Sequence, residues 1–170
     1  MIAMSEHNKS LLNDAGILNL EDASVVMVYT EWNDAIVNEL VAGCEKSLQQ
    51  YQVNKTNKIV VPGAFELPYA CKQYWENTKG TGSQPGAIIA FGCVIRGETP
   101  HFDYVCKAVT EGILQLNLQL PVPVIFGILT VDNEQQALDR LGGAHGHKGE
   151  EAAITALKMI SLQRQLAKSF

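Results

Sequence analysis

The chain has 170 residues, of which 46% are hydrophobic, and a net charge of −5 from 13 Lys and Arg against 18 Asp and Glu. Such a length and composition predict one globular domain with a sizeable core. The absence of a basic stripe argues against a nucleic-acid partner, and the absence of a long apolar run argues against a membrane span. Residues 1–13 resemble neither a secretory signal nor an Arg-rich transit peptide, so we expect a cytoplasmic protein.

The predicted elements begin after a polar, irregular stretch. Residues 1–23 are expected to be an N-terminal arm, either mobile or lent to the sheet edge of a neighbour, and residues 24–170 the single domain. Apolar patterning then predicts, in chain order, a strand at 23–30, a helix at 33–51, a strand at 59–61, a helix at 65–77, a loop at 79–86, a strand at 87–92, a helix at 101–118, a strand at 122–130, a short helix at 133–141, a glycine- and histidine-rich loop at 142–149 and a helix at 150–168.

This alternation of strands and helices is typical of an α/β fold, with a parallel sheet covered by helices on both faces. Ligands of such sheets bind beyond the carboxyl ends of the strands. The conspicuous residues follow three of these ends: Trp32 and Asn33, then 63–66, then 96–101. The four cysteines, in contrast, form no metal or redox motif and are expected to be reduced and buried: Cys44, Cys71, Cys93 and Cys106.

The segment 92–104, GCVIRGETPHFDY, is the most informative. We expect a strand end, a loop bounded by Gly92 and Gly97, and a helix opened by Thr99 as N-cap and Pro100 at its first position. A helix N-terminus after a glycine loop can bind an anion. His101, in the first turn, is either a polar cap or an acid–base group. A helix N-terminus favours the neutral imidazole and a bound anion the charged one, so the sequence leaves its protonation open.

Other polar and aromatic residues each allow two interpretations. Trp32 either caps the core or offers a stacking face to a flat heterocycle, with the second slightly favoured. Glu66 is explained well enough as a first-turn acid that complements the helix dipole. Arg140 and Lys148, which flank the 142–149 loop, are either solvated or form an anion clamp. The two histidines of this loop lack the further ligands that a metal site needs, so no metal is predicted.

Five motifs occur in order from about residue 25 onward: EWN at 31–33, PGAFELP at 62–68, GCVIRGETPHFDYV at 92–105, PVIFGILT at 123–130, and the segment 134–149. On these motifs the chain resembles the 6,7-dimethyl-8-ribityllumazine synthases of riboflavin biosynthesis. The resemblance implies a flavodoxin-like three-layer sandwich with a four-stranded parallel sheet. It implies a homo-oligomer, a pentamer or a hollow shell of twelve pentamers, with riboflavin synthase as a further partner.

The resemblance also implies two substrates, 5-amino-6-(D-ribitylamino)uracil and 3,4-dihydroxy-2-butanone 4-phosphate, and no cofactor or metal. Trp32, followed by Asn33, matches the residue that stacks on the pyrimidine. The segment that holds the ribityl chain, with a carboxylate on its hydroxyls, corresponds to Ala64, Phe65 and Glu66. The strand end that lines the pocket and meets the uracil edge corresponds to Cys93, Val94 and Ile95.

For the second substrate, the resemblance assigns the phosphate to the backbone N–H groups of Glu98 and Thr99. It gives His101 the role of proton transfer. Phe126, Arg140 and Lys148 match residues that reach the site from an adjacent subunit, with the arginine on the phosphate. The resemblance therefore favours functional roles for Glu66, Arg140 and Lys148 where the residues alone did not.

The chain departs from the family pattern at two positions, and its residues also allow two functions other than the synthase. Trp32 stands where many members have Phe, and His147 stands beside Lys148 where many have Asn. One rival is a carrier that binds a lumazine or flavin without turnover; the presence of His101, Arg140 and Lys148 favours the enzyme. The other is a flavin mononucleotide enzyme of the same architecture, but here the predicted phosphate site follows the third strand and not the first.

Overall fold

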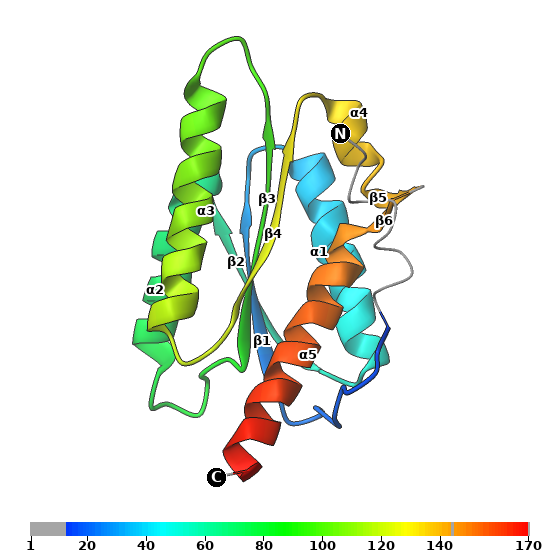
Figure 1. The fold of residues 1–170 in the computed structure, drawn as a ribbon, viewed down its shortest axis with the longest axis vertical. Helices are drawn as coiled ribbons and strands as arrows, with labels where there is room; N and C mark the ends of the chain where they lie inside the picture. Colours follow the sequence, from blue (N-terminus) through cyan, green and yellow to red (C-terminus); the bar gives the residue numbers. More distant parts are fainter. Residues whose placement is uncertain (1–12, 144, 170) are drawn as a thin grey trace.

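The computed structural model describes residues 13–143 and 145–169 and shows a three-layer sandwich (Figure 1). Its central parallel sheet has the strand order β2-β1-β3-β4, and the strands are β1 (Ser24–Thr30), β2 (Lys55–Val61), β3 (Ala87–Ile95) and β4 (Val124–Val131). One face is covered by α1 (Asp34–Gln50) and α5 (Lys148–Ser169), and the other by α2 (Leu67–Thr78) and α3 (His101–Gln119). The predicted α/β fold class is confirmed.

Two hydrophobic cores lie on the two faces of the sheet, because successive side chains of a strand point to opposite faces. In β1, Val25 and Met27 belong to the core under α1 and α5, whereas Val26 and Val28 belong to the core under α2 and α3. β3 divides its buried side chains in the same way. Burial on both faces explains why these central strands read as continuous apolar runs.

Several strand boundaries differ from the prediction. β2 begins at Lys55, four residues before the expected start, because its polar first half pairs with β1 as an exposed edge strand. β3 continues past Gly92 to Ile95, held by pairing with β4 up to Val131. Gly92 therefore lies inside the strand and does not bound the loop; a Cβ there would approach Leu67 Cδ1 to 3.3 Å.

The segment around the predicted 142–149 loop is more ordered than expected. The short helix α4 (Glu134–Leu138) is followed by an antiparallel pair, β5 (Leu141–Gly143) and β6 (Gly146–His147). Helix α5 then starts directly at Lys148. On the other side of the molecule, α2 is preceded by a 3-10 turn, η2 (Ala64–Glu66).

The last part of the expected arm packs on its own chain. Leu20 is buried in the core, the Leu18 N–H donates to Ser161 Oγ at 3.0 Å, and Arg164 binds both carboxylate oxygens of Asp22 at 2.9 and 3.1 Å. The arm was predicted for residues 1–23; its residues 1–12 lie outside the described residues, so a mobile or exchanged arm stays a prediction there. In the part of the chain that is described, no helix is long and apolar enough to cross a membrane.

The N-terminus of α5 lies against α1 at a close backbone approach. A Cβ on Gly149 would stand 2.0 Å from the Leu40 carbonyl oxygen. Gly149→Ala is therefore expected to lower the free energy of unfolding by about 1–3 kcal/mol, as overpacking against backbone does. Urea titration measures this change. Gly82→Ala is the matched control, because a Cβ at Gly82 meets nothing within 4 Å; equal stability of the two variants would contradict the prediction.

Candidate active site

A cavity of about 480 Å³ opens at the carboxyl ends of β1 and β3, where ligands of parallel sheets bind. It contains nine residues predicted from the sequence: Trp32, Asn33, Ala64, Phe65, Glu66, Cys93, Val94, Ile95 and His101. The prediction missed two further lining residues, Thr30 and Val105. Thr30 is the last residue of β1, and Val105 lies one helical turn after His101, so position in the elements could have indicated both.

Two exposed aromatic side chains line the cavity. Trp32 is 65% exposed and Phe65 is 63% exposed, so neither caps the core. Gly63 allows the indole to lie on the backbone, since a Cβ there would be 2.6 Å from the Trp32 ring. Exposed rings that border a cavity provide stacking surfaces for a flat heterocycle.

Asn33 fixes the geometry between the two strand ends. Its backbone adopts the left-handed conformation, with φ 59° and ψ 41°, which Asn tolerates better than most residues. Its side-chain Nδ2 donates to the Cys93 carbonyl oxygen at 2.7 Å. The amide thereby replaces strand pairing at a point where β1 has ended and β3 continues.

Asn33→Ala is expected to lower the free energy of unfolding by about 2 kcal/mol, from the lost hydrogen bond and the strained left-handed backbone. Chemical denaturation tests this value. Asn33→Gly is the matched variant, because glycine removes the bond but accepts the backbone conformation. Alanine should therefore cost more than glycine, and equal losses would contradict a contribution from the backbone.

Glu66 and Cys93 are both constrained. One carboxylate oxygen of Glu66, Oε2, accepts the Gly63 N–H at 3.1 Å, while Oε1 makes no hydrogen bond to the described residues. Burial raises the pKa of the Cys93 thiol to about 11, and Glu134 adds to this effect. The thiol is thus protonated at neutral pH and is no nucleophile. Cys44 and Cys71 are also buried, Cys106 is half-buried, and all four are free thiols.

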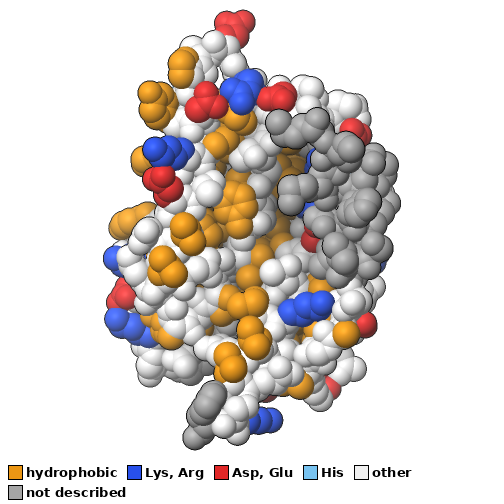
Figure 2. Space-filling view, viewed as in Figure 1, with side chains coloured by type: hydrophobic (Ala, Val, Ile, Leu, Met, Phe, Trp, Pro, Cys, Tyr) orange, Lys and Arg blue, Asp and Glu red, His pale blue; other side chains and the backbone are white. Residues whose placement is uncertain are grey.

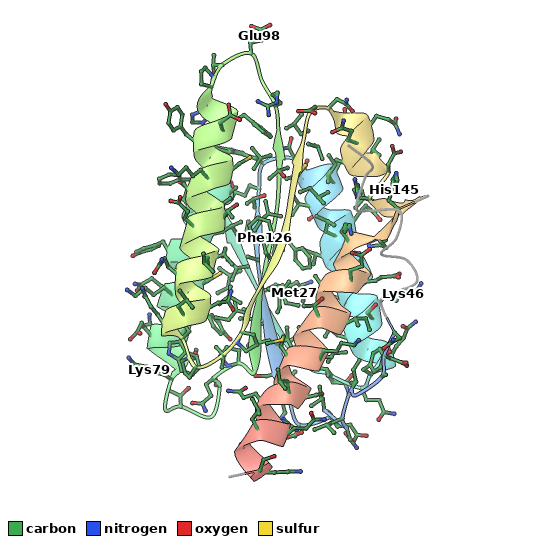
Figure 3. The ribbon with its side chains drawn as sticks, in the orientation of Figure 1. Met27, Lys46, Lys79, Glu98, Phe126 and His145 are labelled. Carbon is green, nitrogen blue, oxygen red and sulfur yellow. The ribbon has the colours of Figure 1, made fainter. Side chains whose placement is uncertain are left out.

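The start of α3 differs from the prediction in its cap. The helix begins at His101 with Pro100 as the residue before it, and no side chain, including that of Thr99, caps it. Glu98 lies at the tip of the loop between β3 and α3 (Figure 3). Within the described residues, the N–H groups of 97–99 make no hydrogen bond. They and the helix N-terminus remain available to an anion.

Arg96, at the start of this loop, binds residues on both sides of it. The sequence did not predict this role. Its Nε donates to Asp132 Oδ1 at 2.8 Å and its Nη1 to Asp103 Oδ1 at 3.2 Å. The guanidinium carbon lies 4.1 Å from the centre of the Phe102 ring. The Asp132 carboxylate, with that of Asp103, raises the pKa of Arg96. The side chain thus links the ends of β3 and β4 to the first turn that carries His101.

Comparison with known proteins agrees with this geometry. The family model for 6,7-dimethyl-8-ribityllumazine synthase matches residues 22–164. The chain belongs to this family. The 6,7-dimethyl-8-ribityllumazine synthase of Cytophaga hutchinsonii is 47% identical over 161 residues, covering 93% of this chain and 98% of the relative. The protein of that name from Porphyromonas gingivalis is 45% identical over 165 residues, covering 96% and 99%.

Family membership makes the chain an enzyme, a transferase of riboflavin biosynthesis. No observation favours the alternative of a carrier without turnover. Among the described residues, no group of three or more His, Cys, Asp or Glu could hold a metal ion. The groups that line the cavity include aromatic rings, a carboxylate and an imidazole.

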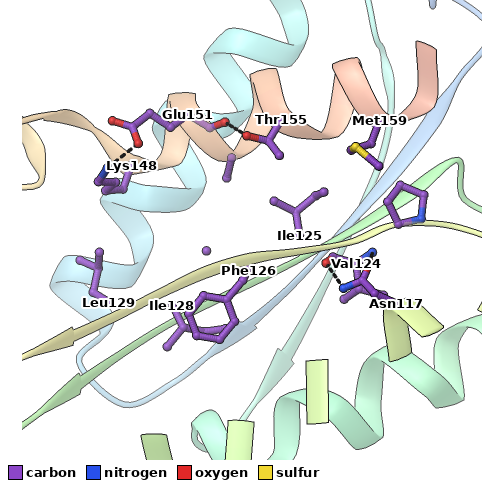
Figure 4. A pocket seen from close by; sticks show the side chains of 13 residues that line it. Asn117, Val124, Ile125, Phe126, Ile128, Leu129, Lys148, Glu151, Thr155 and Met159 are labelled. Atoms are coloured by element: carbon purple, nitrogen blue, oxygen red, sulfur yellow. Dashed lines mark hydrogen bonds and ion pairs between the residues drawn. The ribbon is translucent and has the colours of Figure 1, made fainter. Parts of the chain in front are cut away.

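The remaining predicted residues lie elsewhere in the subunit. Phe126 and Lys148 line a second groove of about 480 Å³ beside the edge strand β4 (Figure 4). Lys148 Nζ pairs with Glu151 Oε2 at 2.5 Å. Arg140 precedes β5, and its guanidinium makes no hydrogen bond or ion pair to the described residues. Glu98, Thr99 and Arg140 line neither cavity.

Proposed function

We propose that the cavity condenses 5-amino-6-(D-ribitylamino)uracil with 3,4-dihydroxy-2-butanone 4-phosphate to give 6,7-dimethyl-8-ribityllumazine, phosphate and water. One observation carries this proposal: a single cavity joins aromatic faces, a carboxylate and an imidazole at a helix N-terminus. Trp32 would stack on the pyrimidine, and Oε1 of Glu66 would accept hydrogen bonds from ribityl hydroxyls.

The open edge of β3 suits the uracil. Pairing between β3 and β1 ends at Phe91, while pairing between β3 and β4 continues to Ile95. On the side facing the cavity, the Cys93 carbonyl oxygen accepts the Asn33 side chain, and no β1 residue pairs with Ile95. Such an edge offers alternating N–H and C=O groups, which match the donors and acceptors of a uracil ring. The adjacent N–H groups of Glu98 and Thr99 would hold the phosphate.

The reaction requires little from the protein beyond positioning and proton transfer. The 5-amino group attacks the butanone carbonyl to give a carbinolamine, which loses water to give an imine. Phosphate then leaves, the resulting enol becomes a ketone, and the ribityl-bearing nitrogen closes the second ring with loss of a second water. Holding both reactants together removes most of the entropic barrier. His101 would move the protons between these steps.

Completion of the site requires a second subunit in this proposal. Phe126, Arg140 and Lys148 would reach the cavity of an adjacent copy, as the family resemblance implies. The face around the edge strand β4 supports an oligomer, because apolar side chains gather along it (Figure 2). They include Phe126, Met159 and Leu162, each at least 39% exposed. The 142–149 segment is short, which permits either a pentamer or a shell of twelve pentamers. The proposal places the enzyme in the cytoplasm, with riboflavin synthase as a further partner.

The deciding experiment is an absorbance assay with both substrates and no added metal or flavin. Appearance of the lumazine product supports the proposal. Tight binding of the uracil without product would instead support the carrier. A purified protein that contains flavin and needs it for activity would support the flavin-dependent alternative.

A further inference from the structure

The imidazole of His147 occupies a space that only a glycine leaves open. Gly43 is a buried residue of α1, and a Cβ placed on it would lie 2.2 Å from Cε1 and 2.6 Å from Nδ1 of His147. The ring therefore packs directly on the backbone of α1. His147 is thus a packed residue and not a solvated loop histidine.

The same ring caps helix α5. Nδ1 of His147 accepts the backbone N–H of Gly149 at 3.2 Å. His147 immediately precedes α5, so this bond satisfies one of the N–H groups that the first turn of a helix leaves without an intrahelical partner. To accept at Nδ1, the ring must be neutral and carry its proton on Nε2.

The capped turn begins with Lys148 and is bonded to Arg140, the residue assigned above to the phosphate. Lys148 directly follows His147, and its N–H donates to the Arg140 carbonyl oxygen at 2.9 Å. Leu141, the neighbour of Arg140, pairs with His147 across β5 and β6. Displacement of the ring would therefore move the backbone of both cations together.

We propose that His147 is a positioning residue, which packs on Gly43 and caps α5 so that Lys148 and Arg140 bind the phosphorylated substrate. This inference rests on the roles proposed above for these two cations. An Asn at this position would offer a side-chain oxygen that serves equally well as an N-cap acceptor.

The test compares four variants by steady-state kinetics with both substrates. His147→Ala and Gly43→Ala should raise the KM for the butanone phosphate on the order of 3–10-fold, the effect of a lost cap, with kcat changed less than about twofold. His147→Asn should retain a KM close to the unmodified protein. In the double variant Gly43→Ala/His147→Ala, the new methyl group has room, so thermal stability should recover while KM stays raised.

His145→Ala is the matched control, because Nδ1 of this neighbouring histidine makes no hydrogen bond to the described residues; its KM should not change. If Arg140→Ala and Lys148→Ala raise KM but His147→Ala does not, the positioning role is wrong and the proposed site stands. If Arg140→Ala and Lys148→Ala also leave KM unchanged, the proposed site fails and the inference fails with it. Equal impairment of His147→Asn and His147→Ala would likewise overturn the role of the cap.

Discussion

Replacement of His101 by alanine is expected to lower kcat by roughly 10²–10⁴-fold, the usual contribution of a general acid–base group, and to leave measurable activity. Among the groups that line the cavity, the Cys93 thiol stays protonated and one oxygen of Glu66 is bound to Gly63. His101 is the lining group whose two ring nitrogens can both accept and donate a proton. Activity remains because proximity of the two substrates is unaffected.

Single-turnover kinetics and a binding titration with the uracil substrate together test this expectation. Uracil affinity should stay within a few-fold, because His101 contributes no stacking face or strand edge. His101→Gln serves as the matched control: it keeps a polar side chain of similar reach but cannot shuttle protons. A glutamine variant with normal kcat would contradict proton transfer, and complete inactivity of a folded, assembled alanine variant would contradict a shuttle that only assists.

The fold was predictable because the buried strands and amphipathic helices of this chain carry clear periodic signals. Where the prediction erred, pairing between distant segments decided the outcome. β2 starts at Lys55 because β1 offers a partner there, and β3 passes Gly92 because β4 pairs with it as far as Ile95. The first half of β2 is polar, so no apolar pattern could indicate it. Residues 93–95 are apolar, but Gly92 separates them from the predicted strand, and pairing with β4 decides that the strand continues.

The candidate site was predictable for a related reason. The carboxyl ends of parallel strands converge, so residues after β1, β2 and β3 had to meet. Tertiary contacts were not predictable: nothing local indicates that Arg96 binds both Asp103 and Asp132, or that the His147 ring lies on Gly43. The division of the predicted residues between two cavities also required the folded chain, because Phe126 and Lys148 lie along the edge strand β4.

Arg140→Ala is expected to raise the KM for the butanone phosphate by roughly 10–100-fold, because a charge-assisted hydrogen bond contributes about 1.5–3 kcal/mol. The KM for the uracil should change little. Arg140→Lys is the matched control, since lysine keeps the charge but loses the bidentate geometry. Its KM should therefore lie between that of the unmodified protein and that of Arg140→Ala. Initial rates at varied butanone phosphate measure this, and an unchanged KM in Arg140→Ala would contradict the assignment.

A mixing experiment decides from which subunit Arg140 acts. In a ring built from head-to-tail contacts, one site would combine His101 of one copy with Arg140 of the next. Co-expression of His101→Ala and Arg140→Ala chains should then restore activity above that of either variant, because some interfaces receive both native residues. If Arg140 served its own subunit, every site of the mixture would lack one of the two residues. Activity would then stay between the two variants, which would contradict the shared site.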